Sequence, residues 1–269
     1  MQLQTLPRNI GVPSTILQNG NISLLGGAGN SWKCLQLDNG TWKEENVLNK
    51  QRFGHSGVKT QSATFLFGGI VSPKTYEYLP KDSTKWIKGK TEIPGDGFAF
   101  GCALAVKSEQ EIWLIGGKPF EGYWTVDKII CFNVTDHSFQ LLPTQLSMIR
   151  RGHRCAYIPN TSKILITGGY HTDILDTTDG SVTRANRTNS IRYDHGMGIL
   201  TINGQDKLVV FGGNEGKFQH MGDNTAIDSV EVYNTETEKW ETTDIKLKEP
   251  KHSFGFLTLK LNDIISNFS

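Results

Sequence analysis

The 269-residue sequence carries almost no net charge and has no long apolar segment. Lysine and arginine number 28 against 27 aspartates and glutamates, so no overall positive field favours binding to nucleic acid or to an anionic membrane. No run approaches the roughly eighteen apolar residues of a membrane-spanning helix, and the first residues lack the charged and apolar regions of a secretion signal. We therefore expect a cytoplasmic protein without nucleic-acid or membrane partners.

Cysteine is also scarce, with four residues in the whole sequence. So few cysteines in a chain long enough to bury a large core indicate buried, reduced thiols. Six Asn-x-Ser/Thr sequons, a modest excess over chance, keep secretion as the alternative if the N-terminus is incomplete. Cys102 and Cys155 precede successive apolar segments in the same way, and they are the pair expected to form a disulfide in a secreted protein. The other cysteines are Cys34 and Cys131, and the sequons are at Asn21, Asn39, Asn133, Asn160, Asn186 and Asn267.

Motifs of common catalytic and metal sites are missing. The sequence has no serine nucleophile elbow, phosphate-binding loop or His-Glu-x-x-His zinc helix. The acidic residues between Asp173 and Asp179 do not follow the alternate spacing of a calcium-binding loop. The sequence pairs of His171 with Asp173 and of His220 with Asp223 supply only two metal ligands each. We therefore expect no cofactor, no metal and no enzymatic activity.

What the sequence does contain is an apolar run that ends in two glycines, repeated five times. Such a short run suits a strand buried on both faces, and glycine lets the backbone take a positive φ or approach a neighbour closely. The first glycines of the pairs are 42, 48, 52 and 44 residues apart, and a period in the forties indicates one structural unit repeated along the chain. The runs are ISLLGG (22–27), TFLFGG (64–69), EIWLIGG (111–117), KILITGG (163–169) and KLVVFGG (207–213).

Each unit reads as four short strands. The first follows a histidine in most units, the second ends in the glycine pair, the third alternates in polarity, and the fourth contains an aromatic residue after a turn. A four-stranded sheet of this kind has two apolar faces, which it buries only by stacking against copies of itself. Because the histidines recur with the unit, we interpret them as structural residues that hydrogen-bond the backbone. They are His55, His153, His195 and His252.

These features together resemble the kelch-repeat β-propellers. The resemblance rests on the five glycine pairs, on the pairs Tyr78 with Trp86 and Tyr233 with Trp240, and on the Arg-x-x-His segments that begin at Arg52 and Arg150. It covers nearly the whole chain. It implies an all-β kelch-type propeller that forms a single domain, residues 1–269, with blades arranged radially around a channel.

Two parts of the sequence depart from the pattern. The fourth unit has no tryptophan after Gly169, and its segment 170–193 is polar and threonine-rich, so we expect an irregular blade with poorly defined outer strands. After Trp240 the chain begins another unit that lacks a glycine pair, and the N-terminus resembles a closing piece for it. We expect six blades, the last one short and built from about 254–268 and 2–6, so that both termini close the ring. The alternative is five full blades plus an incomplete one, in a fragment of a longer protein.

The loops that follow the glycine pairs and the loops that precede the first strands are expected to share one rim of the propeller. Rigid scaffolds carry binding residues on such loops, and aromatic and basic side chains there suit a partner protein or an acidic peptide. The resemblance to kelch adaptors favours the same role. We therefore predict a monomeric protein-interaction module, an adaptor or scaffold with a protein partner. The predicted partner-binding residues are Arg52, Tyr123, Trp124, Arg151, Tyr170, His171, Phe218 and His220.

The alternative function is an enzyme that acts on a sugar or small acid in the central channel. Kelch-type sialic-acid epimerases use a channel lined by arginine and acidic residues. Copper-radical oxidases with kelch propellers need a tyrosine cross-linked to cysteine and two histidine ligands from separate blades, and the sequence does not identify such a set. The arginines that precede or begin first strands, and that suit a channel site for a carboxylate, are Arg52, Arg150, Arg151 and Arg154.

Overall fold

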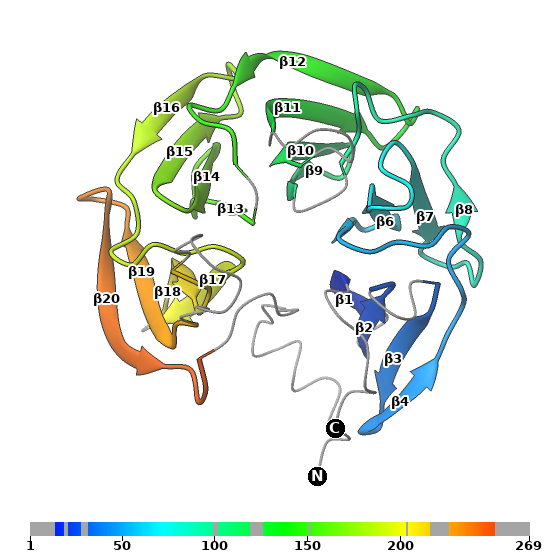
Figure 1. The fold of residues 1–269 in the computed structure, drawn as a ribbon, viewed down its shortest axis with the longest axis horizontal. Coiled ribbons are helices and arrows are strands. Elements are labelled where there is room, and N and C mark those ends of the chain that lie inside the picture. The colour runs from blue at the N-terminus through cyan, green and yellow to red at the C-terminus, as the bar shows by residue number, and fades with distance from the viewer. Residues whose placement is uncertain are drawn as a thin grey trace.

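The structure, a computed structural model, describes residues 14–18, 21–27, 32–98, 102–118, 126–150, 152–202, 204–215 and 226–250. All regular secondary structure in these ranges is β-strand, in five antiparallel sheets of four strands each. The sheets follow one another radially in chain order, with their first strands nearest the centre (Figure 1). This part of the chain is therefore a β-propeller with five blades, and it contains no helix long and apolar enough to cross a membrane.

Each blade is a meander in which consecutive strands pair with each other. Blade 1 contains β1 (Ser14–Gln18), β2 (Asn21–Leu25), β3 (Cys34–Asp38) and β4 (Thr41–Glu44). Blade 2 contains β5 (Ser56–Lys59), β6 (Ala63–Phe67), β7 (Tyr76–Pro80) and β8 (Ile87–Lys88). Blade 3 contains β9 (Ala103–Ser108), β10 (Glu111–Gly117), β11 (Val126–Asn133) and β12 (Phe139–Gln145). Blade 4 contains β13 (Arg154–Tyr157), β14 (Lys163–Gly168), β15 (His171–Asp176) and β16 (Val182–Ala185). Blade 5 contains β17 (Gly196–Ile202), β18 (Gln205–Phe211), β19 (Ser229–Asn234) and β20 (Lys239–Lys246).

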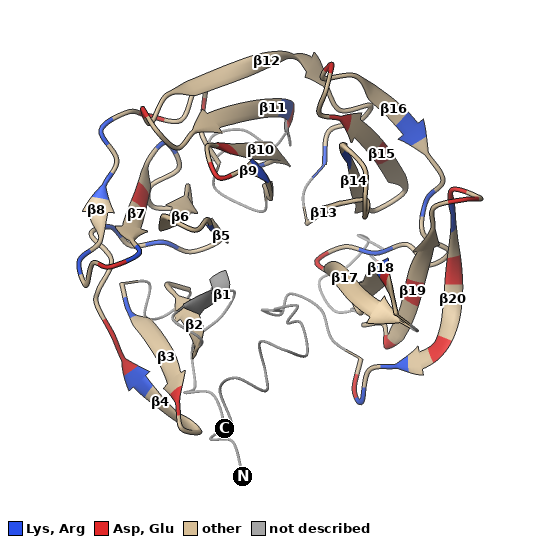
Figure 2. Ribbon diagram, turned by 180° about the vertical axis from the view of Figure 1, so that it is seen from behind, with Lys and Arg blue, Asp and Glu red and all other residues tan. Residues whose placement is uncertain are grey.

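The second strand of a blade is deeply buried and the fourth is exposed. Every residue of β6 is buried, and β10 and β14 are buried from their second residue onward. In contrast, β4, β8, β12 and β20 are largely exposed, and charged residues gather along β4 and β20 (Figure 2). The unbroken apolar runs of the sequence therefore mark strands that pack on both faces. The expectation of four strands in each of five units is confirmed.

Hydrophobic clusters between adjacent blades hold the propeller together. Between blades 2 and 3, the rings of Phe65 and Phe67 pack against Phe132, with centroids 5.5 and 5.2 Å apart. Leu66, between them in the sequence, instead packs with Leu25 in the cluster between blades 1 and 2. Because alternate residues of one strand point to opposite faces, each second strand fills two clusters. The clusters between blades 3 and 4 and between blades 4 and 5 contain, respectively, Ile115 with Ile166 and Leu165 with Leu208.

The glycine pairs end the second strands at points where a side chain does not fit. Gly68 and Gly69 have φ angles of 69° and 106°, and a Cβ atom on Gly68 would lie 2.2 Å from the carbonyl oxygen of Phe98. A Cβ atom on Gly116 would lie 2.8 Å from the ring of His153, which precedes the first strand of the next blade. Glycine alone allows both the backbone conformation and the close approach.

Blade 4 corrects one expectation from the sequence. Its outer strands were expected to be poorly defined, but β15 and β16 complete a regular four-stranded sheet. β15 contains two polar residues, Thr172 and Asp173, whose side chains are buried. The hydroxyl of Thr172 hydrogen-bonds that of Thr167, and the carboxylate of Asp173 accepts a hydrogen bond from Arg150. On β16, Val182 packs against the cluster between blades 3 and 4, so no tryptophan is needed to complete the blade.

The described sheets account for five blades. Contacts between their first strands link the blades in chain order, from β1 through β5, β9 and β13 to β17. The residues expected to form a sixth blade, about 254–268 and 2–6, lie outside the described ranges. A sixth blade therefore stays a prediction.

Candidate interaction surface

Two sets of loops meet at one end of the propeller, and we call this end the loop rim. One set connects the second and third strands of each blade, and the other connects the fourth strand of a blade to the first strand of the next. Backbone hydrogen bonds join the two sets, from Gly27 N to Arg52 O at 2.9 Å, from Gly69 N to Phe98 O at 2.7 Å and from Gly169 N to Arg192 O at 2.7 Å. The expectation that these loops share a rim is thus confirmed.

A buried ion pair anchors the loop that connects blades 1 and 2. Arg52 Nε donates to Glu77 Oε1 at 2.6 Å, and both side chains are fully buried. Arg52 Nη1 also donates to the carbonyl oxygens of Gly68 and Thr75, while Glu77 accepts from the backbone N–H of Asn49. The guanidinium and the carboxylate are both satisfied, which a buried charge pair requires. We call this arrangement the arginine latch.

The arginine latch recurs in blades 4 and 5. In blade 5, Arg192 pairs with Glu231 at 2.8 Å and donates to the carbonyl oxygen of Gly212. In blade 4, Arg150 pairs with Asp173 at 2.7 Å. Burial lowers the pKa of the Arg150 guanidinium, and the carboxylate of Asp173 opposes that shift. In each case the arginine lies in the connection before the first strand of a blade, and the acid lies on the third strand of the same blade. The latch therefore fixes each connection to the blade that follows it.

The arginine latch overturns one predicted binding residue. Arg52 was expected to face a partner on the rim, but its side chain is fully buried and its donors are used inside blade 2. Sequence reasoning also missed the acidic partners. Glu77 in TYEYL and Glu231 in SVEVY occupy the same place in their third strands. A single acid between apolar residues of a buried strand is the signal that points to a buried cation.

Three of the histidines before the first strands, His55, His153 and His195, are buried, but the expected hydrogen bond to the backbone is made by His153 alone among them; both ring nitrogens of His55 and of His195 are buried without a partner. His153 is fully buried, and its Nε2 lies 2.8 Å from the carbonyl oxygen of Ile115 in the preceding blade. Burial, together with the nearby guanidinium of Arg150, lowers the pKa of His153 to about 3. Burial and Arg52 lower the pKa of His55 to the same value. These imidazoles therefore stay neutral at physiological pH, whereas His252 lies outside the described residues.

Exposed apolar side chains concentrate on the loop rim. Of the ten large apolar residues that are exposed in the described part of the chain, six belong to the rim loops. The connections at the other end, between first and second or third and fourth strands, contribute none among the residues that the structure places. The other four lie on strands. The rim residues are Trp32, Val47, Val71, Met148, Ile149 and Tyr170, and the strand residues are Ile87, Leu141, Leu200 and Ile245.

Two of the predicted binding residues lie on the rim as expected. Tyr170 is 51% exposed in the turn between β14 and β15. His171, the next residue, is half-buried and accepts a hydrogen bond at Nδ1 from Arg184 on β16. Sequence reasoning did not identify Arg184. The other predicted residues, Tyr123, Trp124, Arg151, Phe218 and His220, lie outside the described residues.

Near the starts of the first strands, the structure places a small group of ionisable residues. Arg154 begins β13 and donates to the carbonyl oxygen of His153 at 3.0 Å. Burial lowers the pKa of Arg154, while the nearby carboxylate of Asp194 opposes the shift. Arg150 and Arg52 were also expected to suit a channel site. Their side chains are instead buried in the arginine latches of blades 4 and 2. Among the placed residues no group of three or more histidines, cysteines or acids is arranged to hold a metal ion.

All four cysteines are free thiols, so the structure does not form the disulfide that secretion would favour between Cys102 and Cys155. Burial is the main cause that raises the pKa of each thiol to about 12. The thiols therefore stay protonated at physiological pH and are poor nucleophiles.

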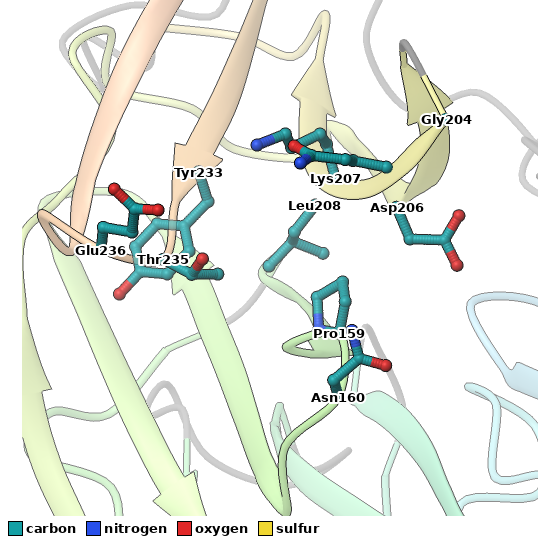
Figure 3. Close-up of a pocket in the computed structure, with 10 residues that line it drawn as sticks. Pro159, Asn160, Gly204, Asp206, Lys207, Leu208, Tyr233, Thr235 and Glu236 are labelled. Atoms are coloured by element: carbon teal, nitrogen blue, oxygen red, sulfur yellow. The ribbon is translucent and has the colours of Figure 1, made fainter.

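A cavity of about 470 Å³ lies at the end opposite the loop rim, between blades 4 and 5. Leu208 and Tyr233 come from neighbouring strands of blade 5, and Pro159 and Asn160 come from the turn before β14 (Figure 3). Burial raises the pKa of the Tyr233 hydroxyl to about 12, so it stays protonated. The remaining lining is polar and mixed in charge, including Asp206, Lys207 and Glu236. This arrangement selects no particular ligand class.

Comparison with known proteins supports the fold. The sequence pattern described as the kelch motif matches residues 197–243, which span blade 5. The solved structure of YjhT aligns with a TM-score of 0.75 over 93% of this chain and 88% of that chain, at 14% sequence identity. No curated protein matches the sequence. At this sequence identity the likeness shows the fold alone, and it extends over most of both chains.

Proposed function

We propose that this β-propeller, whose blade 5 matches the kelch motif, is a protein-interaction module that binds a partner protein through its loop rim. The supporting observation is the unequal distribution of exposed apolar side chains. The rim loops carry six of them, and the opposite connections carry none within the described residues. Exposed apolar groups favour aggregation unless a binding partner covers them. A concentration of such groups at one end of a rigid scaffold is typical of a binding surface.

The arginine latches support the same proposal because they fix the rim loops in place. Each latch satisfies the carbonyl oxygens of its blade with a buried guanidinium, so the loops do not need to be ordered when a partner binds. A surface that is ordered beforehand loses less conformational entropy on binding than a flexible one. The proposed partner is a protein, and the proposed state of the chain is a monomer in the cytoplasm, with secretion as the alternative.

The test is an affinity capture that compares two double variants with the unmodified chain. Trp32→Ala with Tyr170→Ala removes two aromatic side chains from the rim, and we expect it to lose most of the specifically captured partner. Ile87→Ala with Leu141→Ala is the matched control, because these residues are about equally exposed but lie on the outer strands β8 and β12. Both variants should keep the melting temperature. Equal capture by the two variants would contradict the proposal.

The same test applies to the predicted binding residues that lie outside the described ranges. Tyr123 and Trp124 fall between β10 and β11 in the sequence, and Phe218 and His220 fall between β18 and β19. Their sequence positions follow glycine pairs, as Trp32 and Tyr170 do. We propose that they contribute to the same surface, together with Arg151. Tyr123→Ala with Trp124→Ala should then reduce capture without changing the melting curve.

The second candidate function is an enzyme that acts on a sugar or small acid in the channel. The observation in its favour is the placement of Arg154 close to Asp194 near the starts of the first strands. A guanidinium there suits a carboxylate ligand. Small acidic sugars should then raise the melting temperature of the unmodified chain but not that of the Arg154→Gln variant. No shift with any of them, alongside capture that depends on Trp32 and Tyr170, would leave binding as the function.

A further inference from the structure

One part of the loop rim combines apolar and basic side chains, and we call it the blade-4 patch. Met148 and Ile149 lie in the connection between β12 and β13, and each is 43% exposed. Tyr170 and His171 lie at the turn into β15, and Arg184 lies on β16 with its side chain exposed. Three segments of the chain therefore contribute to the patch.

Hydrogen bonds hold these three segments together. Arg150 Nε donates to the carbonyl oxygen of Met148, and its Nη1 donates to the carbonyl oxygen of His171, at 3.3 Å each. Asp173, the cross-strand partner of Arg184, accepts hydrogen bonds from the backbone N–H and the hydroxyl of Ser147. The connection before β13 is thus attached to the start of β15. The apolar and basic side chains of the patch keep fixed relative positions.

Among the described residues, one positive charge of the blade-4 patch has no carboxylate partner. Its carboxylate, Asp173, is fully buried and is occupied by Arg150 and Ser147. The guanidinium of Arg184 is exposed and donates to the Nδ1 atom of His171. Burial and the cations Arg184 and Arg150 lower the pKa of His171, so this imidazole is neutral at pH 7. An exposed guanidinium whose acceptor is a neutral ring would bind a carboxylate more strongly than it binds its present partner.

We propose that the blade-4 patch binds a peptide segment in which an apolar side chain lies beside a carboxylate. This inference rests on the proposed interaction function and specifies its partner. The apolar side chain packs against Tyr170 and the exposed side chains of Met148 and Ile149. The carboxylate accepts hydrogen bonds from Arg184 and from His171. Tyrosine and arginine are the residue types that most often dominate binding energy at protein interfaces.

The geometry also makes binding depend on pH. The charged groups around His171 are Arg184 on β16, Arg150 in the preceding connection and Asp173 on β15. A bound carboxylate adds a negative charge beside the ring, so the pKa of His171 in the complex is higher than in the free protein. Binding therefore takes up a proton, and the affinity rises as the pH falls from about 7.5 to about 6.

The experiment measures fluorescence polarisation of two labelled peptide pools. The acidic pool has one leucine or phenylalanine flanked by aspartate and glutamate, and the control pool has asparagine and glutamine in their place. We expect binding of the acidic pool only, lowered roughly tenfold or more by Arg184→Gln or by Tyr170→Ala. Lys88→Gln, an exposed cation on β8, should have no effect. His171→Gln should bind the acidic pool with little change between pH 7.5 and pH 6.

Each outcome decides between the patch and the wider function. Equal binding of the two pools, no binding of the acidic pool, or full binding by Arg184→Gln would overturn the blade-4 patch. If Trp32→Ala still abolishes partner capture in that case, the interaction function stands and its site lies elsewhere on the rim. If no rim variant changes capture, the interaction function fails, whatever the peptide pools show. Circular dichroism at each pH confirms that the variants remain folded.

Discussion

Replacing Arg52 by methionine tests whether the arginine latch stabilises the propeller. The substitution leaves the Glu77 carboxylate fully buried without its cation, and it removes the donors to the carbonyl oxygens of Gly68 and Thr75. Breaking a buried ion pair by removing one partner costs about 3–5 kcal/mol, because a charge is left uncompensated. We expect the free energy of unfolding of Arg52→Met to fall by about 4 kcal/mol and its melting temperature by about 10 °C.

A second substitution separates the charge from the shape of the side chain. Glu77→Gln in the Arg52→Met background removes the uncompensated charge but keeps an acceptor for the backbone N–H of Asn49. We expect it to recover about 2 kcal/mol of the lost stability. Urea denaturation followed by tryptophan fluorescence measures these differences, and Arg187→Met on the exposed connection between blades 4 and 5 is the matched control. The reasoning is refuted if Arg52→Met stays within about 1 kcal/mol of the unmodified chain, or if the second substitution lowers stability further.

Three further predictions follow from the described contacts. Because His55 and His153 have pKa values of about 3 in the folded chain and about 6.5 when unfolded, folding loses stability as the pH falls below 6.5. The loss is about 2 kcal/mol per histidine at pH 5, and a His153→Gln variant should show a shallower decline in urea denaturation. Gly68→Ala should destabilise the chain by more than about 3 kcal/mol, since its Cβ would meet the Phe98 carbonyl at 2.2 Å; a melting temperature unchanged from the parent would contradict this. The four thiols should react with a disulfide reagent at pH 8 only after unfolding, and fast labelling of the native chain would show that their protonation has been misjudged.

The sequence was most informative where one residue type has one structural cause. The glycine pairs and apolar runs predicted all five second strands, because positive φ angles and burial on both faces are local requirements. Blade 4 was misjudged because the polarity of Thr172 and Asp173 looks like that of a loop until their buried partners are known. The partners come from other strands and loops, and no local pattern identifies them.

The candidate site was predicted in the same uneven way. Tyr170 and His171 follow a glycine pair directly, so their place on the rim could be predicted. Arg52 was misplaced because an arginine in a loop usually lies on the surface. Its burial depends on Glu77, which is 25 residues away in the sequence. Arg184 was missed because its importance comes from the side-chain contact with His171 across two strands.

The hydrogen bonds between glycine pairs and blade connections also set an order for folding during synthesis. Gly27 N needs the carbonyl oxygen of Arg52, which is made only after the whole of blade 1 has been translated. In the same way, the backbone N–H of Gly69 can form its hydrogen bond only after Phe98 has been synthesised, and that of Gly169 only after Arg192 has been synthesised. A blade that has just left the ribosome therefore still lacks the contact that completes it. During synthesis we therefore expect each of these blades to reach its native structure only after the connection to the next blade has been made, with the apolar face of the newest blade exposed until then.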